Sequence, residues 1–208
     1  AALNKHDVTE IRGLTRRISY QAAHDALTGL INRGEFERRL AETLEGGHGD
    51  SVNSVLCYMD LDRFKAVNDT CGHLAGDNML REVAKLIRDQ VRDSDFVARL
   101  GGDEFGMLLI RCPLDKARQI ADDVCNAIRD YRFVWQDRIF TIGISIGLVE
   151  VSRESGTLKD LLSAADSACY VAKQQGRGRV HVYSARDEVS ARQRGDIHWL
   201  RQLQVSLR

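Results

Sequence analysis

The sequence has almost no proline, no long apolar run and no excess of positive or negative charge. Its single proline, Pro113, is placed to open a helix, because proline suits the first helical position. No apolar stretch approaches the roughly 20 residues that a membrane-spanning helix needs, and the N-terminus has no apolar signal-peptide core. We therefore expect a soluble, cytoplasmic segment without direct membrane insertion, although a longer parent protein could be attached to a membrane.

The balance of positive and negative charges argues against functions that need an excess of either. The 30 lysines and arginines match the 30 aspartates and glutamates, which argues against a nucleic-acid partner. With 43% hydrophobic and 29% charged residues, the composition is that of a folded chain rather than a disordered one.

Cysteine is present, but its arrangement suits neither disulfides nor zinc. The five cysteines are odd in number and widely spaced, and none forms a Cys-x-x-Cys pair. This pattern favours reduced thiols, and therefore the cytosol.

A length of 208 residues favours one domain with appendages, since domains average about 150 residues. We expect an N-terminal signalling or linker helix over 1–24, a catalytic domain over 25–184 and a C-terminal linker helix over 185–208. The first helix carries a narrow apolar stripe, which suits either pairing with a second copy or packing on its own domain. The apolar face of the last helix is expected to pack on this domain or to lead into another one.

The hydrophobic pattern predicts alternating helices and strands. Apolar residues at helical spacing indicate helices, whereas short β-branched runs indicate strands. The expected helices cover 7–26, 33–44, 78–91, 113–128 and 157–175, with a turn at 72–77, and the expected strands cover 52–61, 95–100, 105–111, 138–151 and 180–183. This order predicts an α/β (α+β) sandwich with a mixed central sheet.

The turn between the two middle strands is the first candidate site. Gly101 and Gly102 can make a tight turn and let a phosphate approach, because neither has a Cβ. Asp103 and Glu104 follow directly, and paired carboxylates suit Mg²⁺, which prefers hard oxygen ligands. On this motif alone, a solvated acidic hairpin is the other interpretation.

Asp60 strengthens the metal interpretation, because it ends the buried strand that should lie beside this hairpin. Adjacent strands would bring three carboxylates to one sheet edge, where their mutual repulsion raises a pKa unless a cation is bound. Carboxylates that hold two Mg²⁺ ions about 4 Å apart are typical of sites where a hydroxyl attacks phosphorus in line.

Five motifs in order then identify a family resemblance. They are Asp-x-Leu-Thr-Gly-Leu-x-Asn-Arg at 25–33, Asp-x-Asp-x-Phe-Lys-x-x-Asn-Asp at 60–69, Gly-His-x-x-Gly-Asp at 72–77, Gly-Gly-Asp-Glu-Phe at 101–105 and Ala-Lys-x-x-Gly-Arg at 172–177. Over 25–183 the sequence resembles the GGDEF family of diguanylate cyclases, which join two GTP molecules into cyclic di-GMP. The resemblance implies a five-stranded sheet wrapped by helices, similar to the polymerase palm and to nucleotidyl cyclases.

The resemblance also implies roles for individual residues. Two Mg²⁺ (or Mn²⁺) ions per active site would be held by Asp60, the carbonyl of Leu61, Asp103 and Glu104. Asp103, Glu104 and Lys65 are the expected catalytic residues. The expected GTP-binding residues are Asn68 and Asp77 for guanine, Gly101 and Gly102 in the turn, and Lys65, Lys173 and Arg177 for the triphosphate. This chain has Gly178 where the family usually has asparagine, which concerns the rigidity of that loop rather than catalysis.

A second site is implied nine residues before Gly101. Arg92 and Asp95 match the family's Arg-x-x-Asp pattern, at which cyclic di-GMP binds and inhibits the enzyme. Arginine suits this role because its fork matches O6 and N7 of guanine. A surface ion pair would give the same four-residue pattern.

The sequence thus predicts a homodimeric diguanylate cyclase that uses GTP and is inhibited by its product. The alternative is a regulatory module that binds GTP or cyclic di-GMP without turnover and controls a neighbouring phosphodiesterase domain. The two ends resemble a PAS sensor and the linker to an EAL phosphodiesterase domain, so flanking domains are expected in the parent chain. A purely structural dimerisation module would leave the acidic cluster unexplained.

Overall fold

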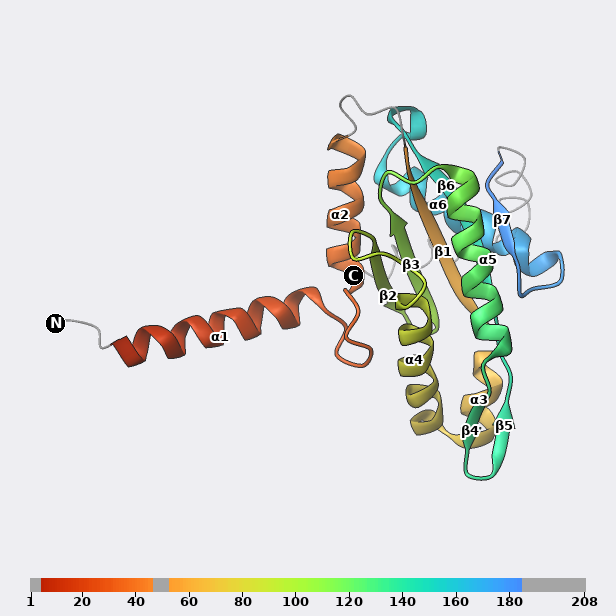
Figure 1. The fold of residues 1–208 in the computed structure, drawn as a ribbon, viewed down its shortest axis with the longest axis horizontal. Helices are drawn as coiled ribbons and strands as arrows, with labels where there is room; N and C mark the ends of the chain where they lie inside the picture. Colours follow the sequence, from red (N-terminus) through yellow and green to blue (C-terminus); the bar gives the residue numbers. More distant parts are fainter. Residues whose placement is uncertain (1–4, 47–52, 185–208) are drawn as a thin grey trace, which may run out of the picture.

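The computed structural model describes residues 5–46 and 53–184, which form a mixed five-stranded sheet covered by helices (Figure 1). The strand order is β2-β3-β1-β6-β7. These strands are β1 (Ser54–Asp62), β2 (Phe96–Gly101), β3 (Glu104–Leu109), β6 (Gly143–Val151) and β7 (Val180–Val182). Only the β6–β7 pair is parallel among them. The predicted fold class, a mixed sheet wrapped by helices, is confirmed.

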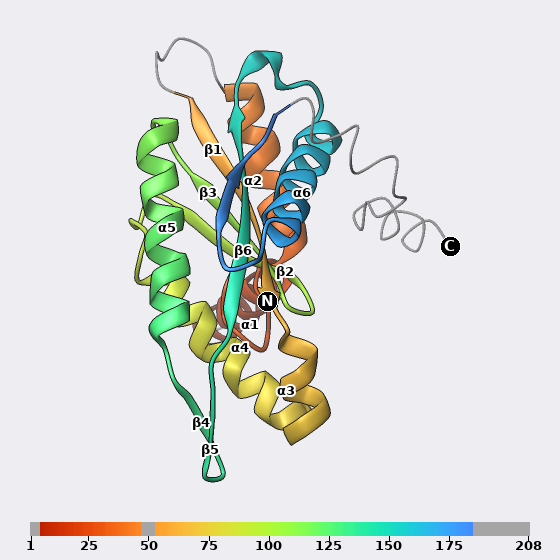
Figure 2. The same cartoon turned by 90° about the vertical axis from the view of Figure 1, so that its right-hand side faces the viewer.

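Helices cover both faces of the sheet, because alternate residues of the buried central strand point to opposite sides. Cys57 and Met59 of β1 belong to the cluster that packs under α4 and α5, whereas Leu56 and Tyr58 belong to the cluster under α2 and α6. Figure 2 shows these helices on either side of the sheet. Their bounds are α2 (Arg33–Gly46), α4 (His73–Arg88), α5 (Leu114–Asp130) and α6 (Leu158–Gln174).

One glycine lets a helix approach the sheet unusually closely. A Cβ at Gly147 of β6 would lie 2.3 Å from the carbonyl oxygen of Ala165 and from the amide nitrogen of Cys169. Gly147 therefore allows α6 to lie directly on β6, as a glycine inside a strand suggests.

Helix α3 (Phe64–Cys71) was not predicted, and α4 begins earlier than the sequence suggested. The whole of 72–77 was expected to be a turn, but Gly72 alone leaves the helical conformation, with φ of 83°. Gly76 is instead buried inside α4, where the absence of a Cβ leaves room for the side chain of Asn68. The predicted turn is therefore wrong beyond Gly72, and Gly76 is a contact between two helices.

The strand expected over 138–151 is also divided. Residues 138–140 form β5 (Arg138–Phe140), which pairs with β4 (Phe133–Trp135) in a separate hairpin, and β6 begins at Gly143. Gln136 and Asp137 make its turn with φ of 44° and 63°. Two-residue hairpin turns need positive φ, and neither residue is the glycine that usually signals it.

The N-terminal helix α1 (Lys5–Ala23) extends away from the sheet (Figure 1). Leu14, Ile18 and Tyr20 are 53%, 66% and 56% exposed, so the described part of this helix does not bury these side chains on its own domain. Within the residues described, no helix is long and apolar enough to cross a membrane. The helix expected over 185–208 lies outside the described residues.

Candidate active site

The acidic turn joins β2 to β3 and places its carboxylates beside the end of β1. Asp60 and Glu104 are directly opposed in the antiparallel β1–β3 register. The N–H of Leu61 donates to the carbonyl oxygen of Asp103 at 3.1 Å, which fixes the turn against β1. Gly101 and Gly102 have φ of 147° and 49°, and no atom beyond their chain neighbours lies within 4 Å of a Cβ built on either. The structure thus brings Asp60, Asp103 and Glu104 to one sheet edge.

Lys173 is the basic group that meets these acids. Its Nζ lies 2.8 Å from Oδ2 of Asp60, reaching across from the last turn of α6. Burial, together with the negative charges of Asp103 and Glu104, raises the pKa of Asp60 to about 6 despite the opposing effect of Lys173. Burial disfavours the ammonium of Lys173, but Asp60 outweighs this effect and the pKa of Lys173 is raised.

Two further residues surround Glu104, and the sequence alone gave neither of them a role. The Nη2 of Arg33 is 4.0 Å from Oε2 of Glu104, and its Nε donates to the carbonyl oxygen of Leu100 at 2.9 Å. Tyr58 lies two residues before Asp60 and is buried beneath the site, where burial and then the charge of Glu104 raise the pKa of its phenol. The sequence does contain a signal for each of them. Tyr58 lies two residues before Asp60, so strand alternation puts both on the same face, and Arg33 is the last residue of the motif at 25–33.

The donor set fits a hard divalent cation in its chemistry. Asp60, Asp103 and Glu104 offer only oxygen, and their mutual repulsion is the kind that a bound cation relieves. As the side chains stand, no three acids, histidines or cysteines within residues 5–46 and 53–184 converge closely enough to hold a metal ion. Lys173 supplies the positive charge beside Asp60 and would have to yield to a cation.

Asn68 and Asp77, the residues that the sequence assigns to guanine, lie on α3 and α4. The Oδ1 of Asn68 is buried and has no hydrogen-bond partner within the part of the chain that the structure describes. A Cβ at Gly76 would lie only 1.9 Å from this oxygen, so glycine is needed beside it. Asp77, the residue after Gly76, also lies within α4 and is half-buried. Lys65 is exposed one turn before Asn68, and within the described residues no hydrogen bond or ion pair joins it to the acidic turn.

Known proteins match the chain over the same segment. The family profile described as "Diguanylate cyclase, GGDEF domain" matches residues 22–179. The chain belongs to this family. It is 48% identical over 177 residues to the probable diguanylate cyclase DgcE of Escherichia coli, covering 85% of this chain and 16% of DgcE. It is 40% identical over 164 residues to the diguanylate cyclase TpbB of Pseudomonas aeruginosa, covering 77% of this chain and 37% of TpbB.

A third relative carries a different name. The cyclic di-GMP phosphodiesterase PdeB of Shewanella oneidensis is 32% identical over 193 residues, which cover 93% of this chain and 22% of PdeB. The chain thus spans between 16% and 37% of the lengths of these three relatives.

Solved structures of GGDEF domains share the fold. The coiled coil and GGDEF domain of DgcB from Caulobacter crescentus, solved in complex with c-di-GMP, has a TM-score of 0.80 at 27% identity, over 85% of this chain and 94% of that one. The GGDEF domain of TpbB has a TM-score of 0.75 at 38% identity, over 81% of this chain and 99% of that one.

The first GGDEF-family motif, at 25–33, holds the acidic turn in place. Asp25 accepts from the N–H and hydroxyl of Thr28 at 2.9 and 2.8 Å, and its Oδ2 lies 3.3 Å from Nη1 of Arg99. Arg99 also donates twice to the carbonyl oxygen of Gly102, at 3.0 and 2.9 Å. Burial would raise the pKa of Asp25, but Thr28 and Arg99 outweigh it, so this pKa is lowered. The segment that follows α1 is therefore tied to the GGDEF turn.

Arg92 and Asp95 form an ion pair at the opposite end of the β2–β3 hairpin. The side chain of Asp95 is fully buried, whereas that of Arg92 is 58% exposed. Asp95 accepts from the N–H groups of Arg92 and Ile110, at 3.2 and 3.0 Å, and from Nε and Nη2 of Arg92, both at 3.1 Å. The guanidinium also donates to the carbonyl oxygen of Ile110 at 3.0 Å and stays more than half exposed, while the carboxylate is already satisfied from within.

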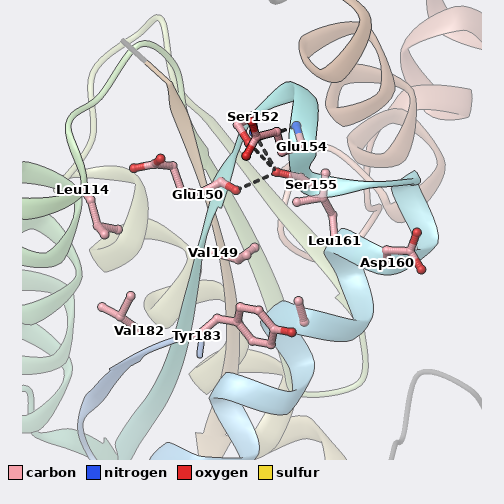
Figure 3. Close-up of a pocket in the computed structure, with 11 residues that line it drawn as sticks. Leu114, Val149, Glu150, Ser152, Glu154, Ser155, Asp160, Leu161, Val182 and Tyr183 are labelled. Carbon is pink, nitrogen blue, oxygen red and sulfur yellow. Dashed lines mark hydrogen bonds between the residues drawn. The ribbon is translucent and has the colours of Figure 1, made fainter. Parts of the chain in front are cut away.

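Arg177, which the sequence assigns to the triphosphate, lies on the exposed loop after α6 with φ of 63°. A separate hollow of about 400 Å³ lies at the other end of α6, between β6, η1 (Arg153–Ser155) and β7. Figure 3 shows its lining, where the hydroxyl of Ser155 donates to the carbonyl oxygen of Glu150 at 3.1 Å. None of the residues that the sequence assigns to GTP, metal or product lines this hollow.

Proposed function

We propose that this GGDEF domain is a diguanylate cyclase that condenses two GTP molecules into cyclic di-GMP. In each of two steps, the 3′-oxygen of one GTP bonds to the α-phosphorus of the other while the bond from that phosphorus to pyrophosphate breaks. The observation that carries this proposal is the register of β1 and β3, which sets Asp60 opposite Glu104 with Asp103 on the adjoining turn. The family membership agrees with it.

Asp60, the carbonyl of Leu61, Asp103 and Glu104 would hold two Mg²⁺ or Mn²⁺ ions, which when bound stabilise charge on the phosphate and lower the pKa of the attacking hydroxyl. The chain itself keeps these carboxylates in place through the turn's hydrogen bond to β1 and through the two donors of Arg99. The proposed catalytic residues are Asp103, Glu104 and Lys65.

Guanine recognition rests on Asn68 and Asp77. The carboxylate of Asp77 suits the N1–H and exocyclic amine of guanine, and the partnerless Oδ1 of Asn68 offers another acceptor. A site built for these groups can reject an analogue that lacks them by about 10⁴-fold. Lys65, Lys173 and Arg177 would neutralise the triphosphate, and Gly101 and Gly102 leave room for it.

The reaction needs two domains face to face, because each carries one set of these residues and the product is two-fold symmetric. An isologous homodimer is the arrangement that satisfies this symmetry. The exposed side chains of Leu14 and Ile18 on α1 support a role for this helix in bringing two copies together.

Product inhibition is proposed at Arg92. Its guanidinium is exposed and suits the O6 and N7 edge of guanine, while Asp95 orients it. Asp95 could accept from a ligand only by giving up one of its present donors.

A second candidate function is favoured by the similarity to PdeB, which is named a phosphodiesterase. In this alternative, the domain binds GTP or cyclic di-GMP without turnover and controls an adjacent EAL-like domain. An upstream sensor domain and a cytoplasmic location of the GGDEF domain complete the proposed setting.

Incubation of the chain with GTP and Mg²⁺ at dimer-forming concentrations tests both candidates, with cyclic di-GMP and pyrophosphate quantified by mass spectrometry and enzymatic assay. We expect two pyrophosphates per cyclic di-GMP, and loss of both products with Asp103→Asn and Glu104→Gln. The exposed Glu45→Gln is the matched control and should retain turnover. GTP binding without any product would favour the regulatory module, and full turnover by Asp103→Asn would contradict the cyclase mechanism.

A further inference from the structure

Asp62 is a buried acid that the proposed reaction does not use. It lies two residues after Asp60, on the same face of β1, and is only 6% exposed. Its Oδ1 accepts from the hydroxyl of Ser145 at 2.7 Å, and its Oδ2 accepts from the N–H of Gly178 at 2.9 Å. The carboxylate therefore joins the central strand to the loop that follows α6.

The surroundings of Asp62 are closed to a ligand. Ser145 is fully buried, and a Cβ at Gly143 would lie 2.9 Å from Oδ2 of Asp62. Both carboxylate oxygens already accept a hydrogen bond from the chain. Asp62 thus differs from Asp60, which contacts Lys173 and has the acids Asp103 and Glu104 nearby.

The loop that Asp62 holds has an unfavourable backbone. Gly176, Arg177 and Gly178 have φ of 119°, 63° and 58°, and a non-glycine residue such as Arg177 pays about 1 kcal/mol or more in the left-handed region. At one end, the N–H groups of Gly176 and Arg177 donate to the carbonyl oxygens of Lys173 and Ala172.

The other end of the loop is fixed to the sheet, where the carbonyl oxygen of Arg179 accepts from Ile146 at 2.9 Å. Gly178 lies between the two anchors, and its N–H is bound by Asp62. Asp62 therefore supplies the central attachment of a strained loop.

Asp60 and Asp62 together attach this part of the chain to β1 at two points. Asp60 holds Nζ of Lys173 at 2.8 Å, and Asp62 holds the backbone of Gly178 at 2.9 Å. Between these two points lies Arg177, whose side chain is exposed.

We propose that Asp62 is a positioning residue that fixes the 176–179 loop so that Arg177 meets the GTP phosphates. The inference rests on the proposed function, because it takes GTP as the ligand of Arg177. Asp62 acts through the Gly178 N–H and touches neither the substrate nor the metal.

The test is a double-mutant cycle between Asp62→Ala and Arg177→Ala, read as KM and kcat for GTP and as GTP affinity by calorimetry. Asp62→Ala should raise KM about tenfold with a smaller change in kcat, as expected when a positioned binding group is released. If Asp62 acts through Arg177, adding Asp62→Ala to Arg177→Ala should cost little more than Arg177→Ala alone.

Asp62→Asn is the conservative variant, because its amide oxygen still accepts from Gly178 while Ser145 turns to accept from its NH₂. It should keep KM within about threefold of the wild type. Gln175→Ala, on the exposed side chain next to the loop, is the matched control and should change neither KM nor kcat. If Asp62→Ala fails to fold, Ser145→Ala loosens the same carboxylate and enters the cycle in its place.

Additive effects of the two substitutions on KM would overturn the positioning role, as would a lower melting temperature with KM unchanged. Failure of the proposed function looks different, because the wild-type chain would then neither bind nor convert GTP. A wild-type chain that binds GTP without turnover still reports on Asp62 through the calorimetric cycle.

Discussion

An acid lies beside each end of the β2–β3 hairpin, Asp95 just before β2 and Asp60 on the neighbouring strand β1, and the surroundings of the two acids are opposite in kind. Asp95, at the open end, accepts four hydrogen bonds from Arg92 and Ile110. Asp60, beside the turn, meets the ammonium of Lys173 and is crowded by Asp103 and Glu104. A carboxylate whose oxygens are filled by backbone and guanidinium donors stabilises a fold. A carboxylate that is crowded by other acids experiences a repulsion that a bound cation would relieve.

The largest expected effect is on activity, and it comes from substituting Asp60, the acid crowded by Asp103 and Glu104. Asp60→Asn should lower cyclic di-GMP formation by about 10³-fold or more, because one of the carboxylates proposed to bind metal is lost. Its unfolding midpoint in urea should stay close to the wild-type value or rise, since a crowded buried charge is removed. Substantial turnover by this variant would show that Asp60 is not part of the reaction.

Substitution of Asp95, whose carboxylate is filled by hydrogen bonds, should instead reduce stability and leave turnover intact. Asp95→Ala leaves the N–H of Ile110 without its acceptor and leaves the guanidinium of Arg92 with only the carbonyl oxygen of Ile110, and should lower the free energy of unfolding by about 3 kcal/mol. Turnover at low temperature, measured below any product accumulation, should be retained. The exposed Asp93→Ala is the matched control, with an expected loss of less than about 1 kcal/mol. Equal losses in the two variants would contradict the structural role.

A pH titration measures the crowding of Asp60 directly. Its pKa is raised from 3.8 to about 6 by burial and by its acidic neighbours, so the protonated form favours folding. The resulting stabilisation is fully present below about pH 4 and is lost as the pH rises through about 6. With a chelator present, the free energy of unfolding of wild type minus that of Asp60→Asn should fall by at most about 3 kcal/mol over this window. A difference that does not vary with pH would exclude the crowding.

The smallest expected effect concerns the bonds that hold the turn. Arg99→Lys keeps the charge near Asp25 but loses the fork that donates twice to the carbonyl oxygen of Gly102. Turnover should fall about tenfold while the free energy of unfolding falls by about 1 kcal/mol. The exposed Arg118→Lys should change neither quantity, and wild-type turnover in Arg99→Lys would mean that the turn holds itself.

Much of the fold was readable from the sequence, because long periodic segments such as 113–128 and the apolar run around β1 leave little choice of structure. The eight-residue α3 and the β4–β5 hairpin were missed since both are short and lack the usual signals. The predicted turn over 72–77 was wrong at Gly76, because the sequence shows a glycine but not the neighbouring Asn68 that needs its space.

The candidate site also has one part that the sequence predicts and another that only the structure shows. The sequence predicted that the strand ending in Asp60 lies beside the hairpin that carries Glu104. The structure adds the register, in which these two residues are directly opposed. The contact of Lys173 with Asp60 and the filling of Asp95 by Arg92 and Ile110 depend on side-chain directions that no spacing encodes. Those directions decide which acid is open to a ligand.

The bond between Asp62 and Gly178 also has a consequence for how the domain comes into being. It joins positions 116 residues apart, so closing this long loop must follow the formation of the sheet that brings its ends together. A nascent chain that still lacks β7 can pair β1 with β3 and bury most of its apolar residues without shaping the loop at 176–179. The last residues of the domain to be synthesised therefore determine when the 176–179 loop takes its shape.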